Sequence, residues 1–412
     1  MNYDVTIIGA GAAGLACGTV CAKSGCAVLI IDREPVAGGI LNQCIHNGFG
    51  LRYFNEELTG PEFAHKMTRR AQEAGVEFAL NSTVTGIKKL ADGSFELRIL
   101  SPRNGVQSVH SATVMLAMGC RERTRGAIAT PGDRPAGVFT AGAAQKLLNR
   151  QGKLPGKSAV IVGSGDIGLI MARRLRWCGI KVNGVIEIMP YTAGLTRNVV
   201  QCLHDFEIPL YLSTSVIRIN GKERVESITA APLDAAKKPV VEKSFTIPCD
   251  TVLFSVGLIP EMELATEMGV RINPRTGGAE VDSMYMTSVP GVFSAGNVLH
   301  VHDLVDFVAE EAESAGKYII DYLSGCRPSG EYTANTGNNL KYVVPGRNSP
   351  AKESRFLFRP TIVCDRAVLK AEVNGENVWN KKLSFVRPAE MIIADIPAGI
   401  LKQDVVFSLE EL

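Results

Sequence analysis

The chain of 412 residues lacks the features that would point to a membrane or a nucleic acid. No apolar run approaches the roughly 18 residues that suggest a membrane-spanning helix. The 44 Lys and Arg residues nearly balance the 42 Asp and Glu residues, so the net charge of +2 would attract neither nucleic acid nor an acidic membrane. The sequence opens on a predicted strand with no basic leader ahead of it. We therefore expect a cytoplasmic protein with no transmembrane segment and no nucleic-acid partner.

The sequence also lacks any Cys-x-x-Cys pair, although it contains ten cysteines. This absence excludes a zinc ribbon or a vicinal dithiol formed by neighbouring residues. A disulfide scaffold is not expected for a chain of this length in a reducing compartment. Most of the cysteines lie in apolar segments, where a thiol behaves as a small hydrophobic group.

Apolar runs that alternate with helical stretches indicate an α/β fold. Residues 4–8, 27–31, 159–162 and 182–186 are rich in Val, Ile and Leu, as is typical of parallel strands buried on both faces. The length allows two or three domains of about 150 residues each. Beyond residue 326 the chain changes: residues 329–350, rich in Gly, Pro, Asn and Ser, predict a linker or extended segment, and short β-type runs follow.

A glycine-rich segment, Gly-Ala-Gly-Ala-Ala-Gly at residues 9–14, follows the first predicted strand and opens a helix. Its glycines allow a tight turn, close approach of the backbone to a pyrophosphate, and close packing of the helix on the strand. The next strand ends at Asp32, 23 positions after Gly9 (32 minus 9). A carboxylate there can accept hydrogen bonds from an adenosine ribose, so this segment predicts a dinucleotide-binding fold.

A second glycine-rich segment, Gly-Ser-Gly-Asp-Ile-Gly at residues 163–168, repeats the pattern. Its second strand ends at Glu187, 24 positions after Gly163 (187 minus 163). Glu187 would bond both ribose hydroxyls of NAD and repel a 2′-phosphate, and residues 188–191 offer no Arg that would bind that phosphate. The second nucleotide is therefore predicted to be NAD(H) rather than NADP(H).

Two such segments resemble the two-dinucleotide-domain flavoproteins of the pyridine nucleotide-disulfide oxidoreductase family, especially its thioredoxin-reductase-like branch. Gly39, residues 116–119 and residues 255–260 are similar to that family's further nucleotide-contacting segments. Residues 291–297 resemble its second FAD fingerprint, with Asn297 in place of the usual Asp. The helix beyond would direct its N-terminus at the flavin N1/O2 edge.

This resemblance covers residues 1–326 and implies the cofactors FAD and NAD(H). It implies two Rossmann-like domains, with the NAD domain inserted into a split FAD domain. The expected parts are the FAD domain in two pieces, the NAD domain between them, and a linker with a small β-rich C-terminal domain: residues 1–120 and 256–326, 121–255, and 327–412. The residues expected at the nucleotides are Gly9, Gly11, Ala13, Gly14, Asp32, Arg33, Gly39, Ile40, Ala117, Gly119, Gly163, Gly165, Asp166, Ile167, Glu187, Gly257, Gly296, Asn297 and Asp306.

The chain departs from this family where the redox-active cysteines would stand. Thioredoxin reductases carry a Cys-x-x-Cys disulfide in the region where this chain reads Thr-Ala-Gly-Ala, at residues 140–143. Cys44 stands alone after Gly39, so the Cys-x4-Cys pair of glutathione-reductase relatives is absent as well. An internal dithiol relay is therefore excluded, and with it thioredoxin reductase activity.

Residues 134–145 are similar to segments of opine oxidase and hydrogen cyanide synthase subunits. Residues 42–48 and 296–303 resemble flavoprotein partners of anaerobic glycerol-3-phosphate dehydrogenase. This second resemblance implies a companion dehydrogenase subunit with its own flavin and, in many cases, a small Cys-rich redox protein. Assembly as a homo- or hetero-oligomer stays open.

The candidate catalytic residues are Cys44, His46 and His302. By analogy Cys44 lies near the flavin ring, where a thiolate could form a charge-transfer contact, a sulfenate or a mixed disulfide, although a lone cysteine is more often part of the packing. His46, His300 and His302 could manage protons near the flavin or make structural hydrogen bonds. No metal is predicted, because no further ligand is evident beyond the segment that contains His300, His302 and Asp303.

The function that these features favour is an FAD-dependent NADH:acceptor oxidoreductase. It would pass hydride between NAD(H) and FAD as the electron-transfer subunit of a multi-component dehydrogenase. One alternative is a disulfide or peroxide reductase that uses Cys44 alone. Another is a non-enzymatic flavin redox sensor or scaffold whose C-terminal domain binds a partner. The electron acceptor, the companion's substrate and the direction of electron flow stay open.

Overall fold

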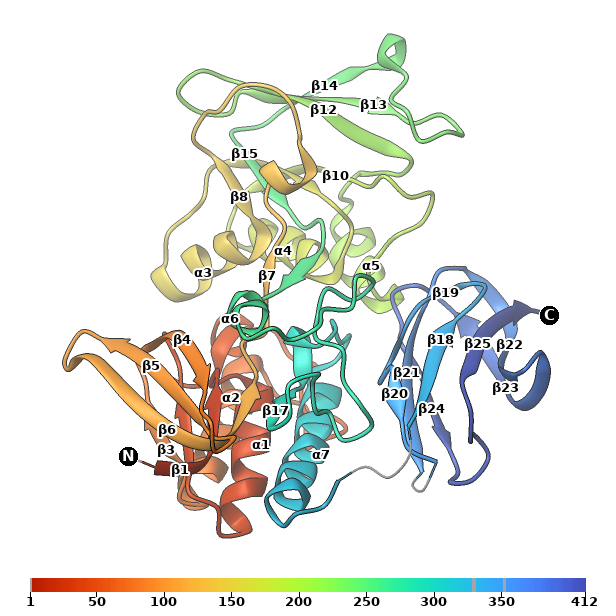
Figure 1. Cartoon of the computed structure of the whole chain (residues 1–412). Coiled ribbons are helices and arrows are strands. Elements are labelled where there is room, and N and C mark those ends of the chain that lie inside the picture. Colours follow the sequence, from red (N-terminus) through yellow and green to blue (C-terminus); the bar gives the residue numbers. More distant parts are fainter. Residues whose placement is uncertain (1, 328–330, 351–352) are drawn as a thin grey trace. The chain divides into compact units, whose positions relative to one another are not determined.

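The computed structural model describes residues 2–327, 331–350 and 353–412. These residues form two compact units, Met1–Cys120 with Pro260–Leu412, and Arg121–Ile259 (Figure 1). Among the described residues, no helix is long and apolar enough to cross a membrane.

The first unit is built on a sheet in the order β3-β2-β1-β6-β5-β4, with β17 also paired to β6. The pairs β1–β2, β2–β3, β1–β6 and β6–β17 are parallel, whereas β4, β5 and β6 form an antiparallel meander. Continuous burial of the central strands fits their Val- and Ile-rich sequences. The strands are β1 (Asn2–Ile8), β2 (Val28–Ile31), β3 (Glu77–Ala79), β4 (Thr83–Lys89), β5 (Phe95–Ser101), β6 (Gly105–Leu116) and β17 (Val292–Ser294).

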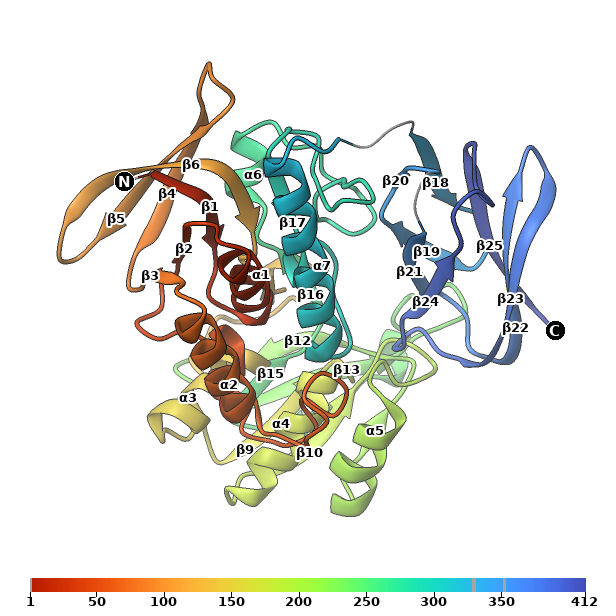
Figure 2. The same cartoon turned by 90° about the horizontal axis from the view of Figure 1, so that it is seen from below.

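Helices α1 (Ala12–Lys23) and α7 (Val305–Leu323) lie side by side in this unit (Figure 2). Gly316 makes this close packing possible, because a Cβ at that position would lie 3.1 Å from the Cys17 carbonyl oxygen. A third helix, α2 (Gly60–Glu73), begins with a capping box in which the Thr59 hydroxyl accepts from the Glu62 N–H and the Glu62 carboxylate accepts from the Thr59 N–H. The loops that precede α1, α2 and α7 contribute residues to the first candidate nucleotide site.

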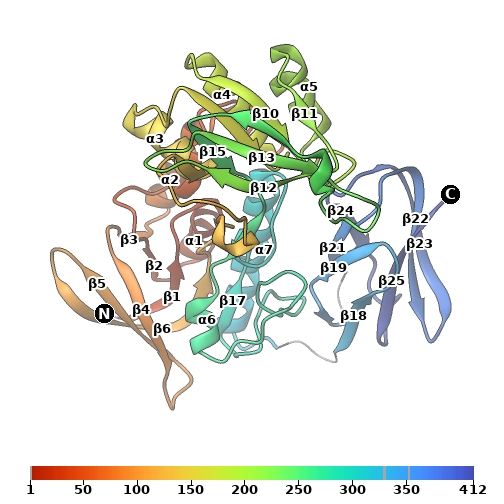
Figure 3. The same cartoon turned by 90° about the horizontal axis from the view of Figure 1, so that it is seen from above.

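The second unit contains a five-stranded sheet in the order β11-β10-β9-β15-β8, all parallel, and a three-stranded antiparallel sheet, β12-β13-β14 (Figure 3). Buried aliphatic side chains of β9, β10 and β15 fill the core between this sheet and its helices. The elements are β8 (Val138–Thr140), α3 (Ala141–Gln151), β9 (Ser158–Val162), α4 (Asp166–Trp177), β10 (Lys181–Ile186), α5 (Thr196–Cys202), β11 (Leu210–Tyr211), β12 (Thr214–Asn220), β13 (Ser227–Pro232), β14 (Phe245–Pro248) and β15 (Thr251–Phe254).

The C-terminal segment of the first unit forms two sheets, β20-β18-β25-β22-β23 and β19-β21-β24, around the rings of Phe356, Phe358 and Phe407. Residues 329–350 were predicted to be a linker or extended segment, and within them residues 332–348 are extended and contribute three strands, β18, β19 and β20. Alternating Leu340 and Tyr342 are buried there, which composition alone concealed. The strands are β18 (Tyr332–Thr336), β19 (Leu340–Val344), β20 (Arg347–Asn348), β21 (Ser354–Pro360), β22 (Cys364–Val373), β23 (Glu376–Val386), β24 (Ile392–Ile396) and β25 (Val405–Glu411). Residues 328–330 lie outside the described residues.

Short elements connect these parts. They are η1 (Gly39–Gln43), β7 (Cys120–Glu122), η2 (Gly126–Ile128), η3 (His204–Phe206), η4 (Val241–Lys243), β16 (Leu258–Pro260), α6 (Glu263–Glu267) and η5 (Gly296–Val298).

Candidate functional site

The first glycine-rich loop turns from β1 into α1, and its three glycines have different roles. A Cβ on Gly9 would lie 2.3 Å from the Ala117 carbonyl oxygen, and a Cβ on Gly14 would lie 1.9 Å from the Gly9 carbonyl oxygen. Gly11, in contrast, has nothing within 4 Å of its Cβ position. The outer glycines are therefore needed for packing, whereas the middle one leaves open space at the N-terminus of α1, as a bound pyrophosphate requires.

Two further predicted segments meet this loop. A Cβ on Gly39, which has φ +55°, would lie 3.1 Å from Gly11 Cα. A Cβ on Gly296, which has φ +77°, would lie 2.8 Å from Ala13 Cβ. The structure thus brings together Gly9, Gly11, Ala13, Gly39 and Gly296, which lie up to 287 positions apart in sequence (296 minus 9). We call this convergence of backbone segments at the N-terminus of α1 the first cradle.

Asp32 at the end of β2 binds the loop itself. Its carboxylate accepts hydrogen bonds from the Ala10 N–H at 2.6 Å and from the Glu34 N–H at 2.8 Å. The acid therefore fixes the first turn of the loop in addition to any contact with a ribose. Arg33 is exposed, and its guanidinium lies 3.9 Å from the Glu261 carboxylate. Ile40 is also exposed at the surface.

The second glycine-rich loop, between β9 and α4, repeats this arrangement. A Cβ on Gly163 would lie 2.1 Å from the Ser255 carbonyl oxygen, and a Cβ on Gly168 would lie 2.9 Å from the Gly163 carbonyl oxygen. The middle glycine, Gly165, has its nearest neighbour at 3.7 Å. The same separation between packing glycines and an open glycine marks a second cradle.

Glu187 and Asp166 hold the chain around the second loop. Buried Glu187 accepts from the Ser164 N–H at 2.9 Å and hydroxyl at 2.5 Å, and from the Met189 N–H at 2.9 Å. Asp166 accepts from the Leu195 N–H at 2.9 Å and from the Asn198 amide at 2.7 Å. Asp166, predicted as a nucleotide contact, therefore ties α4 to the start of α5.

Three further residues were predicted to contact a nucleotide: Ile167 on α4, Gly119 after β6 and Gly257 after β15. Ile167 packs partly buried against the core of the second unit. Gly119 and Gly257 both have positive φ, +71° and +99°, and mark the sharp turns after β6 and β15. Positive φ is the reason for glycine at these two turns.

Cys44 follows η1 in surroundings that oppose thiolate chemistry. Its Sγ lies 3.4 Å from the Ile40 carbonyl oxygen, and a Cβ on Gly60 would lie 2.8 Å from Cys44 Cβ. Burial raises the pKa of the Cys44 thiol to about 12. Reactive cysteines have lowered pKa values, whereas the pKa of Cys44 is raised, so its thiol is protonated at neutral pH.

Two predicted site residues bind within the chain. Asp306, in the first turn of α7, accepts from the N–H groups of Gly50, Arg52 and Tyr53 at 3.1, 3.0 and 2.8 Å. It therefore anchors the loop before α2. The half-buried His46 packs against Phe49, with ring centroids 4.8 Å apart.

His302 joins a cluster that the sequence only half revealed. His300, His302 and Glu311 are all buried, and their ligand-type atoms lie within 4.8 Å of one another. The Asn297 side-chain oxygen accepts from the His302 N–H at 3.0 Å, which links this cluster to the second FAD fingerprint. Glu311 was missed, although it falls on the apolar α7 face with Val308, Ala312 and Ala315, so helical periodicity could have marked it as buried.

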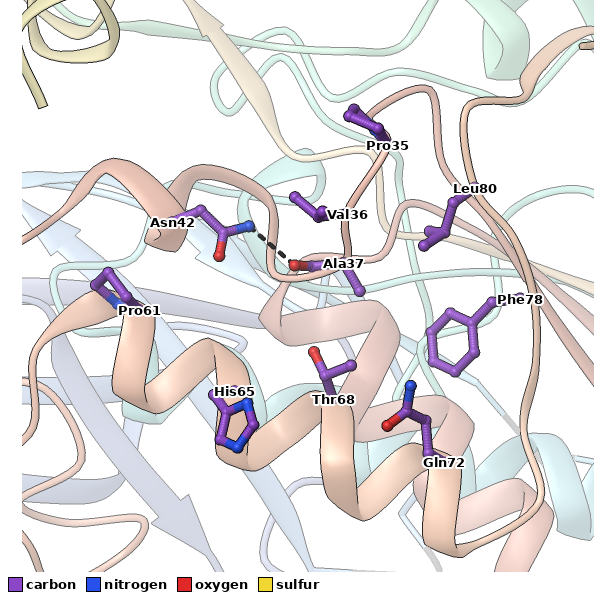
Figure 4. Close-up of a pocket in the computed structure, with 10 residues that line it drawn as sticks. All are labelled: Pro35, Val36, Ala37, Asn42, Pro61, His65, Thr68, Gln72, Phe78 and Leu80. Atoms are coloured by element: carbon purple, nitrogen blue, oxygen red, sulfur yellow. Dashed lines mark hydrogen bonds between the residues drawn. The ribbon is translucent and has the colours of Figure 1, made fainter. Parts of the chain in front are cut away.

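A hollow of about 350 Å³ lies on the first unit, lined by residues of α2 and by residues between Pro35 and Asn42 and between Phe78 and Leu80 (Figure 4). Val36, Phe78 and Leu80 form its apolar side, while His65 and Gln72 of α2 face it from the other side. Asn42 narrows one end by donating from its amide to the Ala37 carbonyl at 2.9 Å. No predicted site residue lines it.

Both glycine-rich loops lie in a part of the sequence that matches a known protein family. The family described as "Pyridine nucleotide-disulphide oxidoreductase" matches residues 3–316. The chain belongs to this family. It is therefore an oxidoreductase with the Rossmann-like domains of FAD/NAD flavoproteins, a family that typically binds FAD and NAD(P)H. The predicted enzyme class is confirmed.

The chain is similar to subunits of multi-component enzymes. It is 26% identical over 324 residues to hydrogen cyanide synthase subunit HcnB of Pseudomonas protegens, covering 72% of this chain and 66% of that protein. It is 24% identical over 313 residues to an opine oxidase subunit of Agrobacterium tumefaciens, covering 72% of this chain and 61% of that protein. The match thus spans no more than two thirds of either relative.

A solved structure confirms the predicted fold class. Thioredoxin reductase of T. acidophilum aligns with a TM-score of 0.64 and 25% identity, covering 78% of this chain and 98% of that one. The predicted α/β fold with two Rossmann-like domains is therefore confirmed, and the C-terminal sheets are additional to it. The finer resemblance to partners of glycerol-3-phosphate dehydrogenase stays a prediction.

Proposed function

We propose that this chain is an FAD-dependent NADH:acceptor oxidoreductase that passes hydride between NAD(H) and FAD. The observation that carries the proposal is the pair of cradles, in which Gly11 and Gly165 each leave open space at a helix N-terminus. Bound FAD would supply the site that accepts a hydride. Residues 9–14, Gly39 and residues 296–297 would hold it, while residues 163–168 and Glu187 would hold NAD(H).

Glu187 supports NAD(H) over NADP(H). Its buried carboxylate stands at the end of β10, bound by the Ser164 and Met189 N–H groups. A negative charge fixed at this place repels a 2′-phosphate. No Arg follows within residues 188–191, so a counter-charge for that phosphate is absent from this segment.

Hydride transfer between two bound rings requires alignment and exclusion of water, and no acid or base from the protein. The absence of a catalytic dyad from the predicted site residues is therefore consistent with the proposal. Residues 140–143 contain no cysteine, and the high pKa of Cys44 opposes a single-cysteine reductase. Electrons are thus proposed to pass to an outside acceptor.

We infer that the acceptor belongs to a multi-component dehydrogenase in which this chain is the electron-transfer subunit. Support comes from the relatives, which are named as subunits of hydrogen cyanide synthase and opine oxidase. The proposed partners are a small Cys-rich redox protein and a companion dehydrogenase subunit. A complex similar to glycerol-3-phosphate dehydrogenase is the form that residues 42–48 and 296–303 favour.

An anaerobic visible spectrum of the purified chain, titrated separately with NADH and NADPH, tests the proposal. We expect a flavin band that NADH bleaches rapidly and NADPH bleaches poorly. A protein purified without flavin would refute the FAD assignment. Bound flavin that neither nucleotide reduces would favour the alternative of a redox sensor or scaffold.

A further inference from the structure

A buried carboxylate links α7 to the loop of the second FAD fingerprint. Glu311 Oε1 accepts from the Gly296 N–H at 2.6 Å and lies 3.1 Å from His302 Nε2, while Oε2 lies 2.8 Å from His300 Nε2. The side chains of the two histidines are 0% and 1% exposed and that of Glu311 is 4% exposed. Three N–H donors therefore converge on one carboxylate out of contact with water.

This cluster is a hydrogen-bonded network. Both oxygens of the Glu311 carboxylate are occupied by N–H donors of the chain. Nδ1 of both His300 and His302 has no hydrogen-bond partner among the described residues. A metal ion held by these three side chains is the competing arrangement.

The hydrogen bonds define the charge of the cluster. Each imidazole must carry a hydrogen on Nε2 to donate to Glu311, and a second hydrogen on Nδ1, which would make the ring a cation, would find no acceptor among the described residues. Burial lowers the pKa of His300, and His302 lowers it further. Burial alone would raise the pKa of Glu311, but His302 and His300 lower it below its usual range. Glu311 is thus held as a carboxylate by three N–H donors, and burial favours the neutral form of His300.

The groups around this cluster come from other elements of the same unit. Arg359 of β21 pairs with Asp303 at 2.6 Å and donates to the Val301 carbonyl at 2.9 Å. The ring of Tyr342 in β19 lies 5.9 Å from that of His300, and Tyr285 interacts electrostatically with Glu311. The Arg359 cation lowers the pKa of His300, so it supports the neutral state of that ring.

We propose that Glu311 is a positioning residue for FAD, which holds loop 296–302 in its binding conformation through Gly296 and His302. The inference rests on the proposed function, because it requires FAD to occupy this loop. Gly296 sits against Ala13 of α1, and Asn297 accepts from the His302 N–H. Glu311 therefore holds Gly296 directly and Asn297 through His302. The two histidines stabilise its buried carboxylate.

The proposal predicts that FAD dissociates faster from the protein at acidic pH. The pKa of His300 is lowered from 6.5 in the folded chain, so the stability that this group contributes is lost as the pH falls below about 6.5. Protonating a ring forces a proton onto Nδ1, which has no acceptor among the described residues. The lowered pKa of Glu311 acts in the same direction at lower pH. FAD should therefore dissociate faster in acid.

The test measures FAD release from the full-length holoprotein after dilution, at pH 7.5 and pH 5.5. Glu311→Gln keeps the shape but turns an amide toward the donors, and it should release FAD about tenfold faster at pH 7.5, with a smaller further increase in acid. Glu310→Gln is the matched control, since Glu310 on the same helix pairs instead with Arg52 at 2.5 Å. It should behave as the wild type.

Each outcome decides one of the two proposals. A wild type that never holds FAD refutes the proposed function. A wild type that holds FAD while Glu311→Gln matches it at both pH values overturns the positioning role. If Glu311→Gln fails to fold, His300→Gln replaces it: this variant has no ring to protonate, so its rate of FAD release should rise less between pH 7.5 and pH 5.5 than that of the wild type, and an unchanged rise would refute the inference. A stoichiometric metal that co-purifies with wild type and not with Glu311→Gln would also overturn it.

Discussion

Replacing Gly11 by Ala separates nucleotide binding from folding. Gly11 has φ −77°, which alanine adopts freely, and no atom lies within 4 Å of the new Cβ. Alanine is a poorer N-cap than glycine by roughly 1 kcal/mol at most, and it recovers about 0.4–1 kcal/mol by restricting the unfolded chain. The free energy of unfolding should therefore change by less than about 1 kcal/mol.

The same methyl group would stand where the FAD pyrophosphate is proposed to lie. Loss of one hydrogen bond to a charged phosphate costs about 1.5–3 kcal/mol, which weakens FAD affinity about tenfold to a hundredfold. Gly11→Ala should therefore be purified folded but with little flavin. The assay is the ratio of flavin to protein absorbance, together with denaturant unfolding of the flavin-free chain.

Two control variants sharpen this experiment. Gly14→Ala places Cβ 1.9 Å from the Gly9 carbonyl oxygen, so it should destabilise the fold by several kcal/mol. Gly165→Ala, at the open position of the second loop, should keep its FAD and lose rapid reduction by NADH. A folded Gly11→Ala protein with a full complement of FAD would refute the assignment of the first cradle.

Single contacts carry three further predictions. Glu187→Gln removes the charge at the end of β10, so the preference for NADH over NADPH should narrow about tenfold in steady-state kinetics, and an unchanged preference would contradict its role. Cys44→Ser should accept electrons from NADH as the wild type does, because the thiol pKa is about 12; a slowed anaerobic reduction would revive thiolate chemistry. Asp303→Asn removes the carboxylate charge that pairs with Arg359 and leaves this guanidinium only its backbone carbonyl partners; Asp303 and Arg359 are each 14% exposed. Denaturant unfolding should show a fall of up to about 3 kcal/mol in the free energy of unfolding, compared with less than about 1 kcal/mol for the exposed control Asp365→Asn.

The two glycine-rich loops were predictable because each depends only on residues close together in the sequence. The turn, the open glycine and the packing glycine occupy six consecutive positions, so their spacing can be read directly at residues 9–14 and 163–168. Apolar strands next to these loops made the parallel sheets predictable in the same way. Glu187 at the end of its strand followed from the same pattern.

Several side chains have partners that the sequence could not reveal. Asp306 binds the N–H groups of a loop 253 to 256 positions away, and Arg359 reaches Asp303 from the C-terminal sheets. Helical periodicity places Glu311 on the apolar face of α7, but only folding brings His300 and His302 to its carboxylate. The strands at residues 332–348 form because their apolar side chains find a core made by distant strands.

The sequence by itself determined the family, the α/β fold, the two glycine-rich loops and the lack of a Cys-x-x-Cys pair, since each depends on residues that are neighbours along the chain. The tertiary structure alone decided that Cys44 lies where burial raises its pKa, that Asp166 and Asp306 bind the backbone, and that Glu311 joins His300 and His302. Burial and hydrogen-bond partners depend on contacts between distant elements, and these exist only when the chain is folded.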